Sequence, residues 1–147
     1  MPADDLEVVL AHLPEHHLLD AIPIELQPWL LPIDWDREQL WQLDLAGSRL
    51  PLEELRWHLE LPWWRHDGLW FQVTPSQFRA DPTAYPEHAQ RIARADLSYP
   101  LHVVRRRERW LILDGIHRLL KADTCGYETI EVLTLTAVDI ARIARYR

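Results

Sequence analysis

The residues with the clearest chemical meaning lie at positions 114 to 118, where the chain reads Asp-Gly-Ile-His-Arg. The apolar run 110–113 predicts a buried strand that ends here, and the residues from Ile116 onward predict a helix. The first turn of a helix leaves backbone N–H groups unpaired, and the helix dipole favours an anion there. Gly115 would allow a tight turn and a close approach by a ligand. The junction therefore predicts a site for a phosphate or carboxylate group.

The helix that follows this turn is two-faced. Its apolar side chains share one face, and three basic residues share the other, namely His117, Arg118 and Lys121. Cations usually favour the C-terminal end of a helix, so two of them in the first turn require a negative partner. Two interpretations fit equally well at this point. Either a bound anion supplies that charge, or Asp114 caps the helix and pairs with Arg118 four residues later.

Several elements are predicted to position this turn. Strand-like apolar runs occur at 69–73, 101–104, 109–113 and 129–135, and the middle two are predicted to form a hairpin. Helices are predicted at 84–97, from 116 to a stop at Gly126, and from 137 onward, whereas 74–82 is predicted to be a loop. This order of strands and helices predicts an α+β domain with a small mixed sheet.

The first 68 residues are rich in Trp and Pro and are expected to form a mainly helical extension that packs on a domain at 69–147. Leucine spacing predicts short helices at 6–12, 37–43 and 51–60, and Gly47-Ser48 is interpreted as a break before the last of these. The tryptophans of this extension are interpreted as packing anchors rather than as a platform for stacking bases.

Composition narrows the classes of function. The 147 residues carry a formal net charge of −7 at pH 7, which argues against a stand-alone DNA-binding domain because such domains are usually basic. Cys125 is the single cysteine, so an intramolecular disulfide is excluded. The N-terminus lacks a basic segment before an apolar one, and no apolar run approaches the ~18 residues of a membrane span. We expect a soluble, cytoplasmic protein with no membrane contact.

Three histidines near the N-terminus invite a metal interpretation, because His12 and His16 are four residues apart and His17 follows. Pro14 interrupts the helix that would align the first two, and no acidic residue stands at a characteristic spacing. No metal site is predicted.

The segment ILDGIHRLLKADTCGYETIEV, from Ile112 to Val132, resembles the signature of the ParB/sulfiredoxin superfamily. Upstream, VTPSQFRADP and HAQRIARADLSYPLHVV resemble the entry segment and the helix of that fold, so that the resemblance covers about 69–135. It implies a ParB-like small mixed sheet with helices. It also implies that Gly115, His117 and Arg118 hold the phosphates of a nucleotide (ATP, ADP or CTP), with or without Mg²⁺.

Departures from the family pattern narrow this expectation. Sulfiredoxins carry a reactive cysteine where this chain has Ile116, so sulfiredoxin chemistry is not expected, and Cys125 is interpreted as a small buried hydrophobe. ParB partition proteins continue into a helix-turn-helix unit, for which the residues up to Arg147 leave no room. The turn is most similar to that of free serine kinases, which implies an ATP/ADP-dependent kinase or a nucleotide hydrolase.

Other residues are assigned supporting roles. Asp114 and Glu87 are the candidate catalytic carboxylates, with surface solvation as the alternative for Glu87. Further candidate phosphate-site residues are Lys121, Arg79, Ser98 and Asp96. The basic run 105–109 is interpreted as a solvated hairpin tip. Two alternative functions remain open: a non-catalytic module that uses the Trp-rich third for a protein partner or for self-association, and a DNA-associated regulator.

Overall fold

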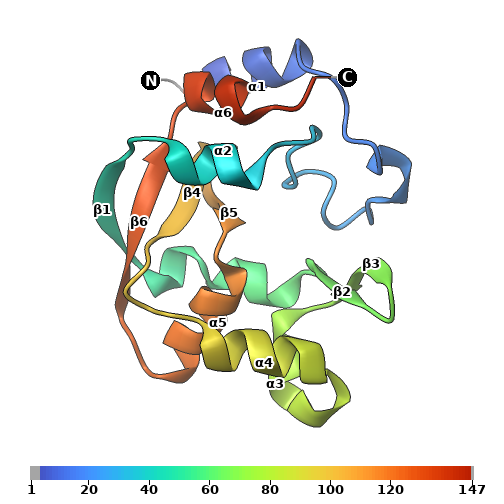
Figure 1. Ribbon diagram of the computed structural model, residues 1–147, viewed down its shortest axis with the longest axis vertical. Coiled ribbons are helices and arrows are strands. Elements are labelled where there is room, and N and C mark those ends of the chain that lie inside the picture. The colour runs from blue at the N-terminus through green and yellow to red at the C-terminus, as the bar shows by residue number, and fades with distance from the viewer. Residues whose placement is uncertain (1–3, 147) are drawn as a thin grey trace.

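A four-stranded mixed sheet forms the centre of the molecule in the computed structural model, which describes residues 4–146 (Figure 1). The strand order is β1-β6-β4-β5, where β6 and β4 are parallel and the other two pairs are antiparallel. The strands are β1 (Ala46–Pro51), β4 (Leu101–Arg106), β5 (Arg109–Asp114) and β6 (Thr129–Leu135). The protein is therefore of the α+β class, with the hairpin β4–β5 as predicted.

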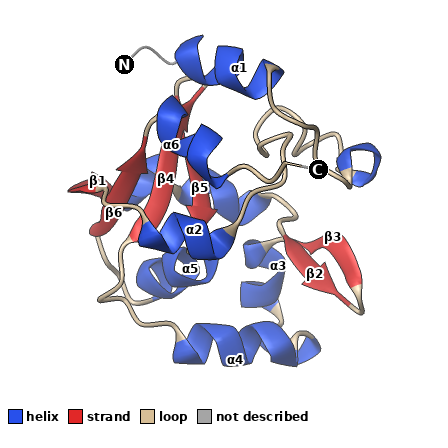
Figure 2. Ribbon diagram, turned by 45° about the horizontal axis from the view of Figure 1, so that its top comes forward, coloured by secondary structure: helices blue, strands red, loops and turns tan. Residues whose placement is uncertain are grey.

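Helices gather at the two ends of this sheet (Figures 1 and 2). At one end, close to both termini, lie α1 (Asp4–Ala11) and α6 (Ala137–Ile143), and α2 (Arg37–Gln42) crosses nearby. At the other end lie α3 (Pro75–Ala80), α4 (Pro86–Arg94) and α5 (Ile116–Thr124). Four short 3-10 turns complete the helical elements of the described residues: Leu19–Ala21, Leu52–Glu54, Arg56–Glu60 and Pro82–Ala84. Between residues 4 and 146, no helix has both the length and the apolar character to cross a bilayer.

The sheet contains a strand that the sequence did not indicate. Residues 46–51, which include the Gly47-Ser48 pair interpreted as a break, form the edge strand β1 and pair antiparallel with β6, so that Ser48 lies opposite Val132. This edge strand is largely exposed, and it therefore lacks the alternating apolar pattern by which strands are recognised. Conversely, the predicted strand β3 (Leu69–Val73) pairs only with β2 (Trp64–His66) in a separate hairpin.

Two helical predictions also need correction. The expected loop at 74–82 contains α3, because Thr74 and Gln77 form a capping box and Pro75 occupies the first turn, where its missing N–H is harmless. The expected helix at 51–60 is instead two 3-10 turns that meet at Leu55, whose φ of −114° departs from helical geometry.

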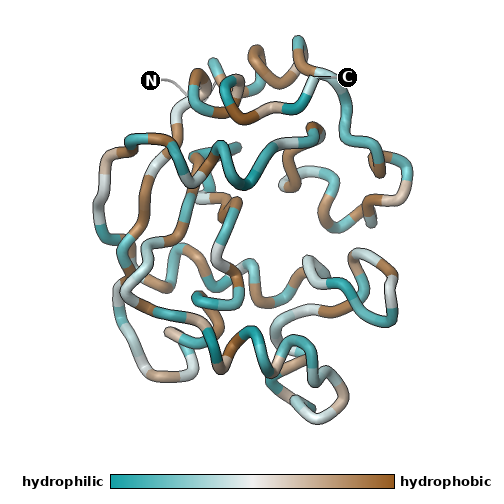
Figure 3. The backbone as a smooth tube through the Cα atoms, viewed as in Figure 1, coloured by the Kyte–Doolittle hydropathy of each residue, from teal (hydrophilic) through white to brown (hydrophobic). Residues whose placement is uncertain are grey.

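Hydrophobic side chains form two cores, one on each face of the sheet, because adjacent strand residues such as Val103 and Val104 belong to different cores. Leu52, Leu101 and Leu119 belong to the core beneath α5, whereas Leu40 and Ile140 belong to the core beneath α1 and α6. Figure 3 shows hydrophobic stretches on the central strands, where these cores meet the sheet. Both cores combine residues from before and after position 68, so the parts expected at 1–68 and 69–147 share their sheet and their cores.

The tryptophans of the Trp-rich third are mostly buried or half-buried, which agrees with their interpretation as packing anchors. Of its six tryptophans, Trp41 alone is strongly exposed, at 59%, and the others belong to the two cores. The basic run at the β4–β5 hairpin is not simply solvated. Arg106 is 3% exposed, pairs with Glu7 at 3.0 Å and donates to the carbonyl oxygens of Trp29 and Leu30.

Candidate functional site

A pocket of about 840 Å³ opens where β5 runs into α5. Its walls come from the end of β5, the start of β4 and of α5, the last turn of α4 with the loop after it, and one side chain of α2. The lining residues are Trp41, Arg91, Arg94, Ala95, Asp96, Tyr99, Pro100, His102, Asp114, Gly115, His117, Arg118 and Leu133. This volume lies within the range of sites for small organic ligands.

Asp114, the last residue of β5, does not cap the helix. Its Oδ2 accepts hydrogen bonds from the indole N–H of Trp41 at 2.9 Å and from Arg118 at 3.3 Å. Gly115 occupies the N-cap position, with φ of 118°, and supplies no side chain to cap the first turn. The capping interpretation is therefore wrong, although the Asp114–Arg118 pair that accompanied it is confirmed. The start of α5 keeps its N–H groups available to a ligand.

Gly115 is required by packing as well as by backbone conformation. A Cβ atom at this position would lie 2.4 Å from Cδ2 of Leu101 and 3.2 Å from a guanidinium nitrogen of Arg118. Its positive φ also disfavours any side chain. The absence of a side chain at Gly115 therefore allows Leu101 and Arg118 to pack against its backbone.

The arginine and the lysine of α5 both donate hydrogen bonds to backbone carbonyl groups. Arg118 donates to the carbonyl oxygens of Tyr99 at 3.1 Å and Pro100 at 2.6 Å. Lys121 donates to those of Ala93 at 3.1 Å and Ala95 at 2.7 Å. Both side chains thus hold the loop between α4 and β4 against α5, and Lys121 does not line the pocket.

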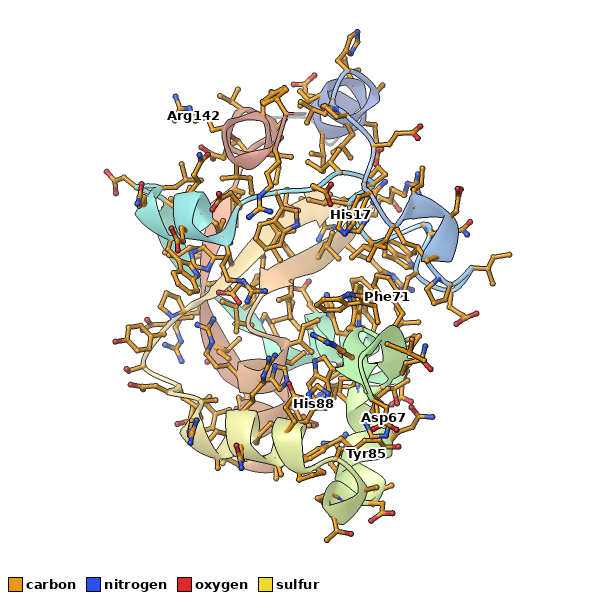
Figure 4. The ribbon with its side chains drawn as sticks, turned by 45° about the vertical axis from the view of Figure 1, so that its right-hand side comes forward. His17, Asp67, Phe71, Tyr85, His88 and Arg142 are labelled. Carbon is orange, nitrogen blue, oxygen red and sulfur yellow. The ribbon has the colours of Figure 1, made fainter. Side chains whose placement is uncertain are left out.

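His117 is a hydrogen-bonding group rather than a cation. Its Nε2 lies 3.0 Å from Nδ1 of His88, whose own Nε2 lies 2.6 Å from the carbonyl oxygen of Arg65. Since a carbonyl only accepts, His88 carries its proton on Nε2, and His117 must donate from Nε2 and keep a lone pair on Nδ1. Burial, with added repulsion from His88 and Arg91, lowers the pKa of His117 to about 3. Figure 4 shows His88 projecting from α4 toward the body of the molecule.

The exposed cations of the pocket stand on α4. Arg91 and Arg94 line the pocket from the last turn of this helix. Among residues 4–146, Arg91 has one weak ion-pair partner, Glu87, at 3.5 Å, and Arg94 makes no hydrogen bond or ion pair. Sequence reasoning missed both arginines, although their spacing of three residues on a strongly polar helix was a usable signal.

The remaining predicted site residues divide between the pocket and other places. Asp96 lines the pocket, and its carboxylate accepts from Ser98, an interaction that lowers the pKa of Asp96. Ser98 itself is not a lining residue. Arg79 belongs to α3 and pairs with Asp123 at 2.7 Å, so it lies outside the pocket. Glu87 is exposed on α4 and does not line the pocket either.

His102 is another residue that sequence reasoning missed. It lies in β4 directly opposite Asp114 of β5, so that the two side chains share one face of the sheet. The residue is 8% exposed, and its Nδ1 is buried without a hydrogen-bond partner, 4.0 Å from Oδ2 of Asp114. Burial lowers the pKa of His102, although Asp114 acts in the opposite direction. Because its neighbours in the sequence are apolar, His102 was treated as part of a buried strand and not as a candidate site residue.

One cluster of potential metal ligands lies far from this pocket in the sequence. His16, His17 and Asp34 bring three ligand atoms within 4.8 Å of one another. The backbone N–H of Leu18 donates to Nδ1 of His16, so Nε2 of His16, which is the nitrogen 3.5 Å from Asp34, carries the hydrogen. In a metal-bound histidine the nitrogen away from the metal donates instead. With His17 and Asp34 in hydrogen-bond contact at 2.6 Å, the cluster is a polar tie between two loops.

Comparison with known proteins adds no relative. No protein-family model, no curated protein and no solved structure matches this chain.

Proposed function

We propose that the pocket binds a nucleotide, with its phosphates between the last turn of α4 and the open start of α5. The observation that carries the proposal is the meeting of Arg91 and Arg94 with an uncapped helix N-terminus in one pocket. Among the lining residues three arginines face two aspartates, although the whole chain has a net charge of −7. Phosphate attraction is therefore local to this pocket.

Two aromatic side chains of the pocket suit a planar ring. Trp41 and Tyr99 are lining residues that are 59% and 64% exposed, so both are accessible to a base. Stacking of a base on an aromatic side chain contributes about 1–3 kcal/mol and tolerates any base. The lone pair on Nδ1 of His117 adds an acceptor for a ligand hydroxyl or amino group. An aromatic wall, an acceptor and cations together match the parts of a nucleotide.

The resemblance to the ParB/sulfiredoxin superfamily supports the same function, because the proposed pocket includes Gly115, His117 and Arg118 of the motif. The roles within it differ from those that the resemblance implied. Arg118 shapes the pocket and His117 accepts, whereas charge recognition belongs to Arg91 and Arg94. ATP, ADP and CTP are the expected ligands, with Mg²⁺ as a companion of the phosphates.

Burial of the tryptophans disfavours the alternative of an interaction module. That function would need a continuous exposed Trp patch in the first third, and five of the six tryptophans there belong to the cores. Trp41 is the exposed one, and it belongs to the pocket.

The test is a thermal-shift and calorimetric titration with ATP, ADP and CTP, each with and without Mg²⁺. A ligand at 100 times its dissociation constant adds about 2.7 kcal/mol to stability and raises the melting temperature measurably. The double variant Arg91→Ala/Arg94→Ala should bind at least about tenfold more weakly, since it removes both exposed cations.

A matched control is Arg142→Ala. Arg142 is similarly exposed, lies on α6 at the far end of the molecule (Figure 4) and should leave affinity unchanged. The proposal is wrong if no nucleotide in the panel binds, or if the double variant binds as tightly as the unmodified protein.

A further inference from the structure

The Nδ1 atom of His102 is buried and has no hydrogen-bond partner among the described residues, and no structural role explains this. An unsatisfied buried polar atom costs about 1–3 kcal/mol, so its retention calls for a reason. Oδ2 of Asp114 lies 4.0 Å from this nitrogen. Because Nδ1 is the buried nitrogen, Nε2 is the nitrogen through which the ring meets the pocket that it lines.

The strand pairing explains why these two side chains meet. His102 and Asp114 are cross-strand partners in the β4–β5 ladder, and the ladder shifts register immediately after them. Trp41 and Arg118 fix the carboxylate from two other elements, α2 and α5. A carboxylate held rigidly behind Nδ1, with Nε2 toward a ligand site, is the arrangement by which a histidine acts as a general base. Such contacts are often long before substrate binds.

We infer, on the basis of the nucleotide site proposed above, that His102 is a general base for phosphoanhydride hydrolysis and that Asp114 is its positioning residue. Nε2 of His102 takes a proton from a water molecule as the water oxygen attacks the terminal phosphorus. The new P–O bond forms and the bond to the bridging oxygen breaks, so that the nucleoside diphosphate departs with that electron pair and the attacked group becomes inorganic phosphate. The proton on His102 is then released to solvent, and Asp114 stabilises the imidazolium meanwhile.

His117 is the weaker base of the two, although it lines the same pocket, because burial lowers its pKa to about 3. Its Nε2–H donates to the neutral ring of His88, and between residues 4 and 146 no carboxylate lies within hydrogen-bond distance to stabilise its protonated form. The groups that act on His102 are different: Asp114 of β5 favours its protonated form, and Arg118 of α5 opposes it. The two histidines of the pocket thus have different roles: His117 accepts a hydrogen bond from the ligand, and His102 is the general base.

The experiment measures inorganic phosphate released from ATP and CTP in the presence of Mg²⁺, alongside calorimetric affinity for the same nucleotides. His102→Gln should lower kcat by about 100-fold or more, the usual contribution of a general base, while the dissociation constant changes less than threefold. His66→Gln, on β2 and outside the pocket, is the control and should match the unmodified protein.

A pH profile of Asp114→Asn supplies a second readout that does not depend on His102→Gln folding. Activity should fall on the acid side as the base becomes protonated. Removal of the carboxylate that raises the pKa of His102 should move this limb to lower pH and reduce kcat. Asparagine can still accept from Trp41 and Arg118, so the pocket is kept.

The outcomes separate the two proposals. Nucleotide binding without phosphate release, an unchanged rate in His102→Gln, or an unmoved acid limb in Asp114→Asn overturns the assignment of His102 and leaves the binding site standing. Absence of nucleotide binding overturns both. Phosphate release that depends on His102 and shifts with Asp114 supports both.

Discussion

Two helices bring basic residues to the same pocket, and they use them differently. On α5, Arg118 and Lys121 donate to four backbone carbonyls of the α4–β4 connection and its neighbours. On α4, Arg91 and Arg94 line the pocket with exposed side chains. The basic residues of α5, which carries the recognisable motif, therefore stabilise the walls of the pocket. The arginines of α4 provide the positive charge that is accessible to a ligand.

The difference follows from where each helix lies in the fold. Helix α5 packs on the sheet through the buried side chains of Leu119, Leu120 and Ala122, so its polar side chains meet the neighbouring loop. Helix α4 is an outer layer with a single buried residue, His88. A cation close to buried backbone is used to satisfy carbonyls, and one on an outer helix stays free for ligands. Motif membership alone therefore does not identify the residues that recognise charge.

The largest expected effect is on stability and comes from α5. Arg118→Met keeps most of the side-chain volume but leaves two carbonyls and Asp114 without their donor. Since hydrogen bonds to charged groups contribute about 1.5–3 kcal/mol each, the free energy of unfolding should fall by about 3 kcal/mol in urea titrations. Arg94→Met on α4 should change it by less than about 0.5 kcal/mol. Equal losses of unfolding free energy in the two variants would contradict the different roles assigned to the basic residues of α5 and α4.

A somewhat smaller loss is expected from Gly115→Ala. The new methyl group would meet Leu101 at 2.4 Å in a backbone conformation with φ of 118°, and the free energy of unfolding should fall by about 2 kcal/mol. Gly126→Ala is the matched control, because its φ is also positive but nothing lies within 4 Å of the added atom. The excess over this control measures how tightly α5 is seated, and no excess would mean that Leu101 moves away freely.

A smaller difference between the two helices is expected in how salt affects nucleotide affinity and stability. Raising the ionic strength about tenfold screens the exposed cations of α4 and should weaken nucleotide binding about tenfold, which is ~1.4 kcal/mol. The effect of Arg118→Met on stability should stay nearly constant, because Arg118 is only 16% exposed. Calorimetry and urea titration at both salt concentrations check the two halves. Salt-independent binding would place ligand recognition elsewhere than on α4.

The smallest effect is the pH dependence attached to His117. Its pKa is about 3 in the folded protein against 6.5 for the free side chain, so the unfolded chain binds the extra proton between these values. Its contribution to stability is complete above pH 6.5 and is lost as the pH falls toward 3. His117→Gln should therefore flatten the stability profile by about 1 kcal/mol between pH 6.5 and 5.5. His58, with a pKa also lowered to about 3 by burial, keeps the remaining slope. An unchanged profile would mean that His117 titrates normally.

Local patterns predicted much of the fold and part of the site. Alternation and apolar runs located β4, β5, β6 and α5, and the strand-to-helix turn pointed to the pocket that contains Asp114 and Gly115. The edge strand β1 was missed because its residues are exposed on both faces and its partner, β6, is about 80 residues away. His102 was missed for a different reason: its apolar neighbours made it an ordinary strand residue, and the exact pairing of the predicted hairpin, which places it opposite Asp114, could not be read from the sequence. Partners as distant along the chain as β1 and β6 leave no local pattern.

The pairing of β1 with β6 has a practical consequence for any attempt to shorten the chain. Removal of the residues before position 52 would uncover the backbone donors and acceptors along β6, a strand that carries Ile130, Val132 and Leu135. An open, apolar strand edge is a template for pairing with another chain. A fragment that begins at residue 69 would retain the whole recognisable motif, yet we expect it to aggregate rather than fold alone.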